Sequence, residues 1–142
     1  MTTLSPQEIK KALVAEGFEV FRILEGHVVL ADRVRENLIL DSGVRLVPEP
    51  LAIVVIFRVQ QSDFPNEDEN TLFDRARDLA AASHAQGFAE HGTAVAPVND
   101  PADGSRILDT FYEVSMSRRV DSLADAFHWL KIALAFEKTT AS

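Results

Sequence analysis

The stretch from Phe111 to Glu137 changes its hydrophobic period partway along. Residues 111–116 alternate with period two, as a half-buried strand does, whereas residues from Leu123 onward recur with a period near 3.6, as an amphipathic helix does. Ser122 lies between them at the position of a helix N-cap, with Asp125 three residues later. A strand that leads into a helix within so short a distance predicts a fold that mixes both kinds of element.

The beginning of the chain carries the complete chemistry of a helix start. Ser5 stands at the N-cap, Pro6 at the first helical position and Glu8 at the third. Gly17 supplies a stop, because glycine readily takes the left-handed backbone that ends many helices. The sequence therefore predicts a helix between Ser5 and Gly17.

Strand patterns follow. The segments 20–24 and 27–31 flank Glu25-Gly26, and this arrangement predicts a hairpin. Residues 32–47 contain a charged segment, a short apolar segment and a turn signal. They are compatible with a strand of the sheet and with an irregular connection. Residues 51–60 are apolar on both faces at their start, which is typical of a central strand.

The second half of the chain predicts another helix and another hairpin. A helix is expected from about Thr71 to Gln86, and strands are expected over 88–98 and 106–116. The whole order is α-β-β-β-α-β-β-α. It predicts an α+β fold in one domain, residues 1–142, with a twisted, mainly antiparallel sheet of about five strands and helices packed on it.

Composition narrows the functional classes. The 142 residues include 22 acidic and 14 basic side chains, and the formal net charge of −8 makes nucleic acid an unfavourable partner. The absence of cysteine excludes disulfides, thiolate metal sites and a cysteine nucleophile. No signal-peptide pattern or membrane-length apolar run is present, so we expect a soluble, cytoplasmic protein without membrane association.

No catalytic motif stands out. The four histidines occupy positions 27, 84, 91 and 128, and none has a second histidine at the helical i, i+4 spacing of zinc enzymes. The glycines are scattered beside turn signals, without a phosphate-binding loop or a nucleophile elbow. We therefore expect no metal and no cofactor. Enzyme activity is left open, with the non-enzymatic reading preferred.

The last helix carries two apolar stripes. The expected core stripe consists of Leu123, Phe127, Leu130 and Leu134. The second stripe consists of Trp129, Ile132 and Phe136. A helix wedged between two layers of one chain would use both stripes, and so would a helix that contacts a partner or a second copy. The second stripe is the candidate partner-binding surface.

Three arginines form a candidate anion site. Arg118 and Arg119 come at the end of one predicted strand, and Arg106 comes at its beginning. Guanidinium groups bind carboxylate and phosphate oxygens well. In an acidic chain the same groups also neutralise nearby carboxylates, which is the structural reading of this cluster.

The element order, the mass of 15.7 kDa, the acidic pI and the closing amphipathic helix together resemble the class I type III secretion chaperone fold. They are also similar to its relatives, the bacterial sensory-transduction regulators. The resemblance covers the whole chain by element order, without a shared motif, so it transfers no residue role. It implies a twisted antiparallel sheet with helices packed on it, a homodimer, and protein binding without catalysis.

Three functional hypotheses follow. The first is a non-enzymatic, chaperone-like or regulatory protein-binding domain that acts as a homodimer. The second is a small-molecule-binding domain or an enzyme, with a pocket between sheet and helices and an anionic ligand held by Arg58, Arg106, Arg118 or Arg119. The third is a structural subunit of a larger assembly.

Overall fold

The computed structural model describes residues 4–139. The chain divides into two compact units. One unit contains the residues up to Val55 together with Ser117–Phe136, and the other contains Ile56–Met116 together with the segment that starts at Glu137. The first is called the α1–α3 unit below, and the second the α2 unit. Strands β4 and β6 each contribute residues to both.

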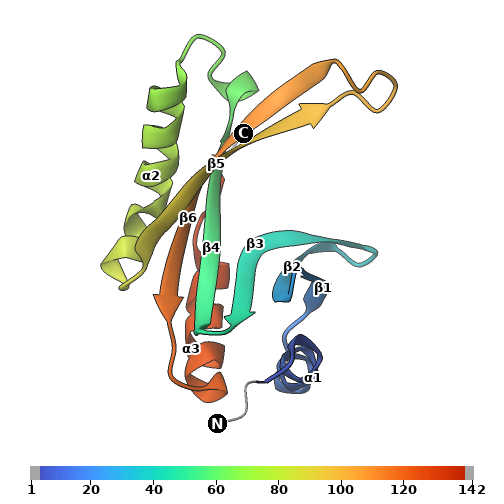
Figure 1. The fold of residues 1–142 in the computed structure, drawn as a ribbon, viewed down its shortest axis with the longest axis vertical. Coiled ribbons are helices and arrows are strands. Elements are labelled where there is room, and N and C mark those ends of the chain that lie inside the picture. Colours follow the sequence, from blue (N-terminus) through green and yellow to red (C-terminus); the bar gives the residue numbers. More distant parts are fainter. Residues whose placement is uncertain (1–3, 140–142) are drawn as a thin grey trace. The chain divides into compact units, whose positions relative to one another are not determined.

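The elements follow the expected order, and the segment left open supplies one further strand (Figure 1). The helices are α1 (Pro6–Glu16), the short 3-10 helix η1 (Gln61–Asp63), α2 (Glu69–Ala85) and α3 (Leu123–Ala135). The strands are β1 (Val20–Leu24), β2 (His27–Arg35), β3 (Leu38–Pro48), β4 (Leu51–Gln60), β5 (Ala89–Asn99) and β6 (Ile107–Arg119). The predicted α+β class is confirmed.

The strands form one antiparallel, open sheet in the order β1-β2-β3-β4-β6-β5. It has six strands rather than about five because residues 38–48 form a full strand. β4 lies between β3 and β6, so the central position predicted for residues 51–60 is confirmed. At the two edges lie β1 and β5.

Helix α1 begins as its cap chemistry predicts. The Ser5 hydroxyl oxygen accepts a hydrogen bond from the backbone N–H of Glu8 at 3.2 Å, and the N–H of Ser5 donates to the Glu8 carboxylate at 3.1 Å. Both bonds satisfy N–H groups that lack partners within the helix. Gly17 ends the helix with a φ of 102°, in the left-handed region. Ile9 and Leu13 are fully buried and attach α1 to its unit.

A buried hydroxyl in β3 bonds to backbone groups at an irregular part of the β2–β3 ladder. Ser42 donates from its Oγ to the carbonyl oxygen of Leu30 at 2.7 Å, and the same Oγ accepts from the N–H of Val44 at 3.1 Å. The β2–β3 register shifts between Val29 and Ala31, and these bonds satisfy backbone groups near that irregularity. Val44 and Leu46 then enter the core of the α1–α3 unit.

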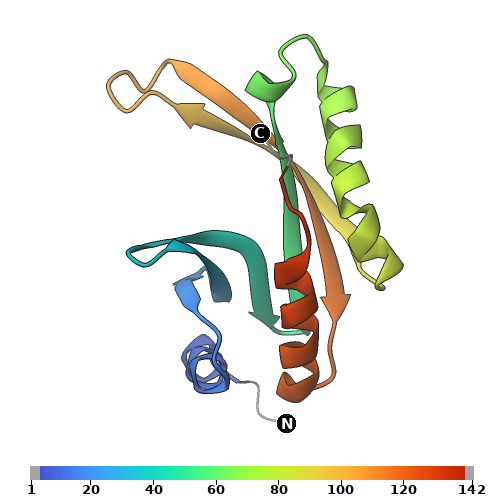
Figure 2. The ribbon, with the colours of Figure 1, turned by 180° about the vertical axis from the view of Figure 1, so that it is seen from behind.

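Helix α3 packs on the sheet (Figure 2), and its most buried face is rotated from the expected one. Its buried residues are Ala126, Leu130 and Ala133, whereas Leu123, Phe127 and Leu134 are only half-buried. Within the expected core stripe only Leu130 is fully buried, and Phe127 contacts the Phe18 ring at 5.9 Å between centroids. The buried trio lies between the two apolar stripes on the helical wheel. The small side chains of Ala126 and Ala133 allow the helix to approach the sheet closely. The larger side chains of the two apolar stripes then lie on either side of this contact.

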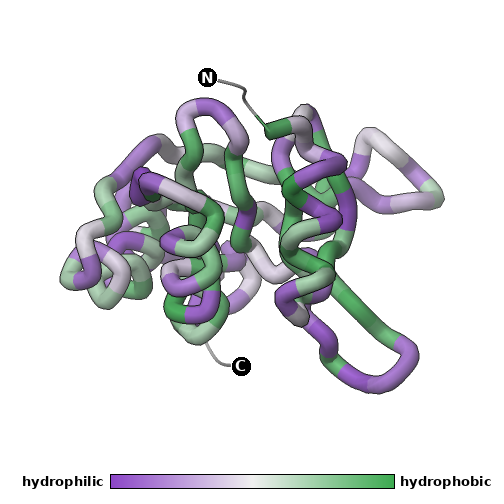
Figure 3. The backbone as a smooth tube through the Cα atoms, turned by 90° about the horizontal axis from the view of Figure 1, so that it is seen from below, coloured by the Kyte–Doolittle hydropathy of each residue, from purple (hydrophilic) through white to green (hydrophobic). Residues whose placement is uncertain are grey.

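In the α2 unit, helix α2 contacts β5. Asp68 caps the helix by accepting from the N–H of Thr71 at 2.9 Å, so the helix starts slightly earlier than predicted. Its buried residues are Leu72, Ala76, Ala80 and Ser83. Along the backbone, hydrophobic and hydrophilic segments alternate (Figure 3). Apart from Leu72, the buried side chains of α2 are therefore small.

Candidate binding surfaces

A groove lies beside helix α2 and has a volume of about 420 Å³. Most of its lining is apolar. It is lined by Ala80 and Ala81 from α2, Ala89 from β5 and Met116 from β6, with Arg77, His84 and Glu90 as its polar residues. Because alanine side chains are short, the helix and the strand leave room between them instead of filling it. The space suits one or two aliphatic side chains.

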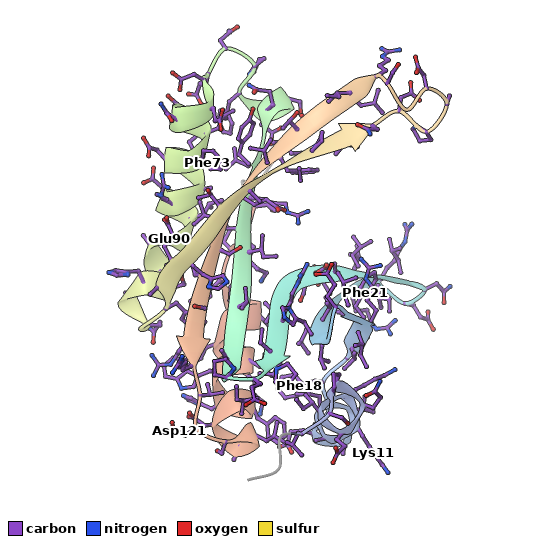
Figure 4. The ribbon with its side chains drawn as sticks, in the orientation of Figure 1. Lys11, Phe18, Phe21, Phe73, Glu90 and Asp121 are labelled. Atoms are coloured by element: carbon purple, nitrogen blue, oxygen red, sulfur yellow. The ribbon has the colours of Figure 1, made fainter. Side chains whose placement is uncertain are left out.

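An ion pair connects the two sides of this groove. Arg77 on α2 donates from Nε to the Glu90 carboxylate on β5 at 2.8 Å, and Glu90 lies beside the helix (Figure 4). The hydrogen bond from Arg77 lowers the pKa of Glu90 below its ordinary value. The same bond raises the pKa of Arg77. Both groups stay charged at neutral pH and largely neutralise each other.

Strand β5 is the most exposed long element of the α2 unit. Every residue of β5 is exposed except Gly92 and Ala96, which are half-buried. A strand at the edge of a sheet leaves one row of backbone N–H and C=O groups without strand partners. Charged residues, proline and bulges are the usual protection against unwanted pairing. β5 has Pro97 near its end, but the segment Thr93–Ala96 has no charge.

The far end of the β5–β6 hairpin exposes aliphatic side chains, and these four residues are called the ribbon cluster. The cluster consists of Val95, Val98, Ile107 and Leu108, with exposed fractions of 48%, 38%, 59% and 52%. Ile107 and Leu108 are consecutive in a strand, so their side chains point to opposite faces. Both faces of the ribbon therefore expose aliphatic side chains there. Two-stranded ribbons are only marginally stable in water without cover.

The charge of the chain is unevenly distributed between the units. Residues 56–116 contain eleven acidic side chains and four arginines, a formal net charge of −7. Residues 1–55 and 117–136 contain ten acidic and nine basic side chains, a formal net charge of −1. Nearly all of the net negative charge therefore belongs to the α2 unit, which has few basic side chains. A field of this kind attracts cationic partners and repels anionic ones.

The predicted partner-binding stripe on α3 is half-buried at all three positions, Trp129, Ile132 and Phe136. Arg118 of β6 covers the Trp129 ring, with its guanidinium carbon 3.7 Å from the ring centroid. His128 also contacts this ring edge-on, at 5.1 Å between centroids. The stripe is thus a partly covered surface, and its role in partner binding stays a prediction.

The three arginines of the predicted anion site occupy opposite ends of one strand. Arg106 directly precedes β6, whereas Arg118 and Arg119 are its last two residues. A strand rises by about 3.3 Å per residue, so the two ends are far too distant for one small anion. Arg118 instead lies against Trp129.

Arg58, the fourth arginine considered for a ligand, has protein partners. Its Nη2 lies 2.7 Å from the Glu113 carboxylate, and its guanidinium carbon lies 5.0 Å from the Phe111 ring centroid. Its backbone N–H donates to the carbonyl oxygen of Lys138 at 2.9 Å. These contacts give Arg58 a structural role between neighbouring strands.

Asp109 is the most heavily hydrogen-bonded carboxylate of the α2 unit. It accepts from Ser62 Oγ at 2.6 Å, Ser62 N at 3.1 Å, Gln60 Nε2 at 3.1 Å and Thr110 N at 2.8 Å. The bond from the Ser62 hydroxyl is the main cause that lowers its pKa. A carboxylate held ionised by four donors ties β6 to η1. It is poorly suited to proton transfer near neutral pH.

Sequence reasoning did not name the residues that line the groove, and it missed the ribbon cluster. The position of a groove depends on the strand that the fold places beside the alanines of α2. For residues 4–139, no group of three or more metal-ligating side chains converges, and no helix is long and apolar enough to cross a membrane. Comparison with protein-family models, curated proteins and solved structures finds no match to this chain.

Proposed function

We propose that this chain is a non-enzymatic protein-binding domain. The ribbon cluster is the observation that carries the proposal, because both faces of the β5–β6 hairpin expose aliphatic side chains. Exposed apolar groups beside an open strand edge are typical of protein interaction sites. The groove adds an apolar recess in the same unit.

A small-molecule site receives less support. The groove has the volume of a ligand pocket, but its lining is mainly alanine and methionine. Its two charged groups, Arg77 and Glu90, are already paired with each other. Small-molecule sites usually combine an apolar wall with several convergent polar groups that orient the ligand. Protein side chains that enter from outside suit this recess better.

The test is partner capture with a surface variant. Ile107→Asn combined with Leu108→Asn removes two exposed aliphatic groups, so folding should be unaffected and capture of the partner from native cells should be lost. Val14→Asn, on an equally exposed position of α1, is the matched control. If the double variant captures the same partner as the wild type, the ribbon is not the binding surface.

We further propose that the chain acts as a homodimer through the stripe Trp129, Ile132 and Phe136. Support comes from the half-buried state of all three and from the small net charge of their unit, which allows close approach of two copies. Light scattering on the variant with Trp129→Ala and Phe136→Ala should show a monomer that keeps its circular dichroism spectrum. A monomeric wild type, or a variant that unfolds, would contradict this assignment.

A further inference from the structure

We propose that β5 and the groove beside it bind an extended, positively charged segment of a partner protein as an added strand, with one aliphatic side chain of that segment in the groove. This inference rests on the proposed protein-binding function and names the chemistry of the partner. Strand addition at a sheet edge is a known mode of peptide recognition, in which backbone hydrogen bonds supply affinity and side-chain pockets supply specificity.

The backbone of β5 is available for such pairing. At the hairpin end, the N–H of Asp100 donates to the carbonyl oxygen of Arg106 at 2.8 Å. Asp100 therefore directs its N–H toward β6. In a regular antiparallel ladder every second residue does the same, and the residues between them direct their backbone groups away from β6. Pro97, three positions before Asp100, is one of the residues that face away from β6. Proline has no N–H, so Pro97 limits the added strand at this end. Residues 89–96 remain as the docking edge.

The groove supplies the side-chain pocket. Its lining residue Ala89 is the first residue of β5, so a strand paired with β5 passes next to the opening. Ala80, Ala81 and Met116 form the apolar wall. The volume of about 420 Å³ accommodates a leucine, isoleucine or valine side chain. An aliphatic anchor flanked by backbone pairing is therefore the expected ligand pattern.

Charge decides between a partner segment and a second copy. Two copies paired edge to edge through β5 would bring together two units of formal net charge −7, and this repulsion opposes their association. A segment rich in lysine or arginine is attracted by the same field. Charge complementarity therefore favours a basic occupant of the β5 edge.

The experiment uses the full chain and a short fluorescein-labelled peptide in which lysine and valine alternate around a central leucine. Fluorescence anisotropy should show saturable binding that weakens about tenfold when the salt concentration rises from about 50 to about 300 mM. A peptide with glutamate in place of lysine should not bind. A lysine peptide with N-methyl groups on alternate backbone nitrogens should not bind either, because its strand pairing is blocked.

Two α2 variants test the groove itself. Ala81→Trp fills the groove, whereas Ala82→Trp places the same side chain on an exposed position that does not line it. Ala81→Trp should weaken peptide binding by about tenfold or more, as loss of an anchor contact does, and Ala82→Trp should leave it unchanged. Circular dichroism confirms that both variants are folded.

Three results would overturn the inference. The first is equal binding of the acidic and basic peptides, and the second is unchanged peptide binding by the Ala81→Trp variant. The third is light scattering that shows a dimer for the wild type and a monomer for Ala81→Trp, because a second copy would then be the occupant of the groove. None of them refutes the proposed binding of a partner through the ribbon cluster, which fails if the variant with Ile107→Asn and Leu108→Asn retains its partner. The two proposals are therefore separately refutable.

Discussion

The guanidinium carbon of Arg118 lies 3.7 Å from the centroid of the Trp129 ring, within the α1–α3 unit. Arg118 belongs to β6 and Trp129 to α3, so the contact ties the end of the strand to the helix that follows it. Cations over indole rings are attracted by the negative face of the ring. A residue predicted for anion binding and a residue predicted for partner binding thus contact each other.

Trp129 is the single tryptophan of the chain and reports directly on this contact. Arg118→Ala should red-shift its fluorescence, because water gains access to the uncovered ring. The substitution should also lower the free energy of unfolding by about 0.5–1 kcal/mol, the usual contribution of a cation–π pair at a partly exposed site. The neighbouring variant Arg119→Ala, at an exposed position, should change neither quantity. Equal spectra for the two variants would contradict the assignment.

Leu130 holds α3 to its unit and is fully buried. Leu130→Ala should lower the free energy of unfolding by about 2–5 kcal/mol, because the lost methyl groups leave a cavity in a packed interior. Lys131→Ala, one position further along on the exposed side, should cost little. Urea denaturation measures both values. A small effect at Leu130 would mean that the flanking stripes, rather than the buried trio, hold the helix.

Asp109 makes the free energy of unfolding depend on pH in the acidic range. Its pKa is lowered in the folded chain by the Ser62 hydroxyl and by three further donors, so its contribution is present above the unfolded pKa of about 3.9. The contribution is lost as the pH falls through the folded pKa. Asp109→Asn should therefore reduce the free energy of unfolding by about 1 kcal/mol at pH 7, and the difference from wild type should vanish in strong acid.

Urea denaturation from about pH 7 to about pH 2 measures this dependence. Asp32→Asn, at an exposed position of β2, is the control. The explanation would be abandoned if the difference between Asp109→Asn and wild type stayed constant across this range.

Ser5 tests the helix start. Ser5→Ala removes the hydroxyl that accepts from the N–H of Glu8, and N-cap substitutions of this kind cost about 1 kcal/mol. Gln7→Ala, exposed in the first turn, keeps the cap and should change stability by a few tenths of a kcal/mol at most. Thermal unfolding followed by circular dichroism compares the two. Equal melting temperatures would show that the cap contributes nothing measurable.

Local chemistry explains where sequence reasoning succeeded. The α1 cap involves residues three positions apart, and the β1–β2 turn at Glu25 and Gly26 involves adjacent residues with positive φ. Such features need no information about distant parts of the chain. The central position of β4 was also readable, because both of its faces are apolar.

Residues 32–47 show where local reasoning stopped. Their mixed polarity obscured two strand segments, which extend β2 and form most of β3. The buried Ser42 hydroxyl bonds to Leu30, twelve residues away, and this bond satisfies a backbone group at an irregular part of the ladder. No periodicity in the sequence encodes such a contact, since it depends on the neighbouring strand.

The stretch between Phe111 and Glu137 combines both cases. Its change of period correctly indicated a strand followed by a helix with its cap at Ser122, because period and capping depend on residues within one turn. Burial on α3 depends instead on the sheet that covers it, and the most buried face, which contains Leu130, lies between the two apolar stripes. The ribbon cluster and the groove arise in the same way, since exposure depends on which surfaces the rest of the chain leaves uncovered.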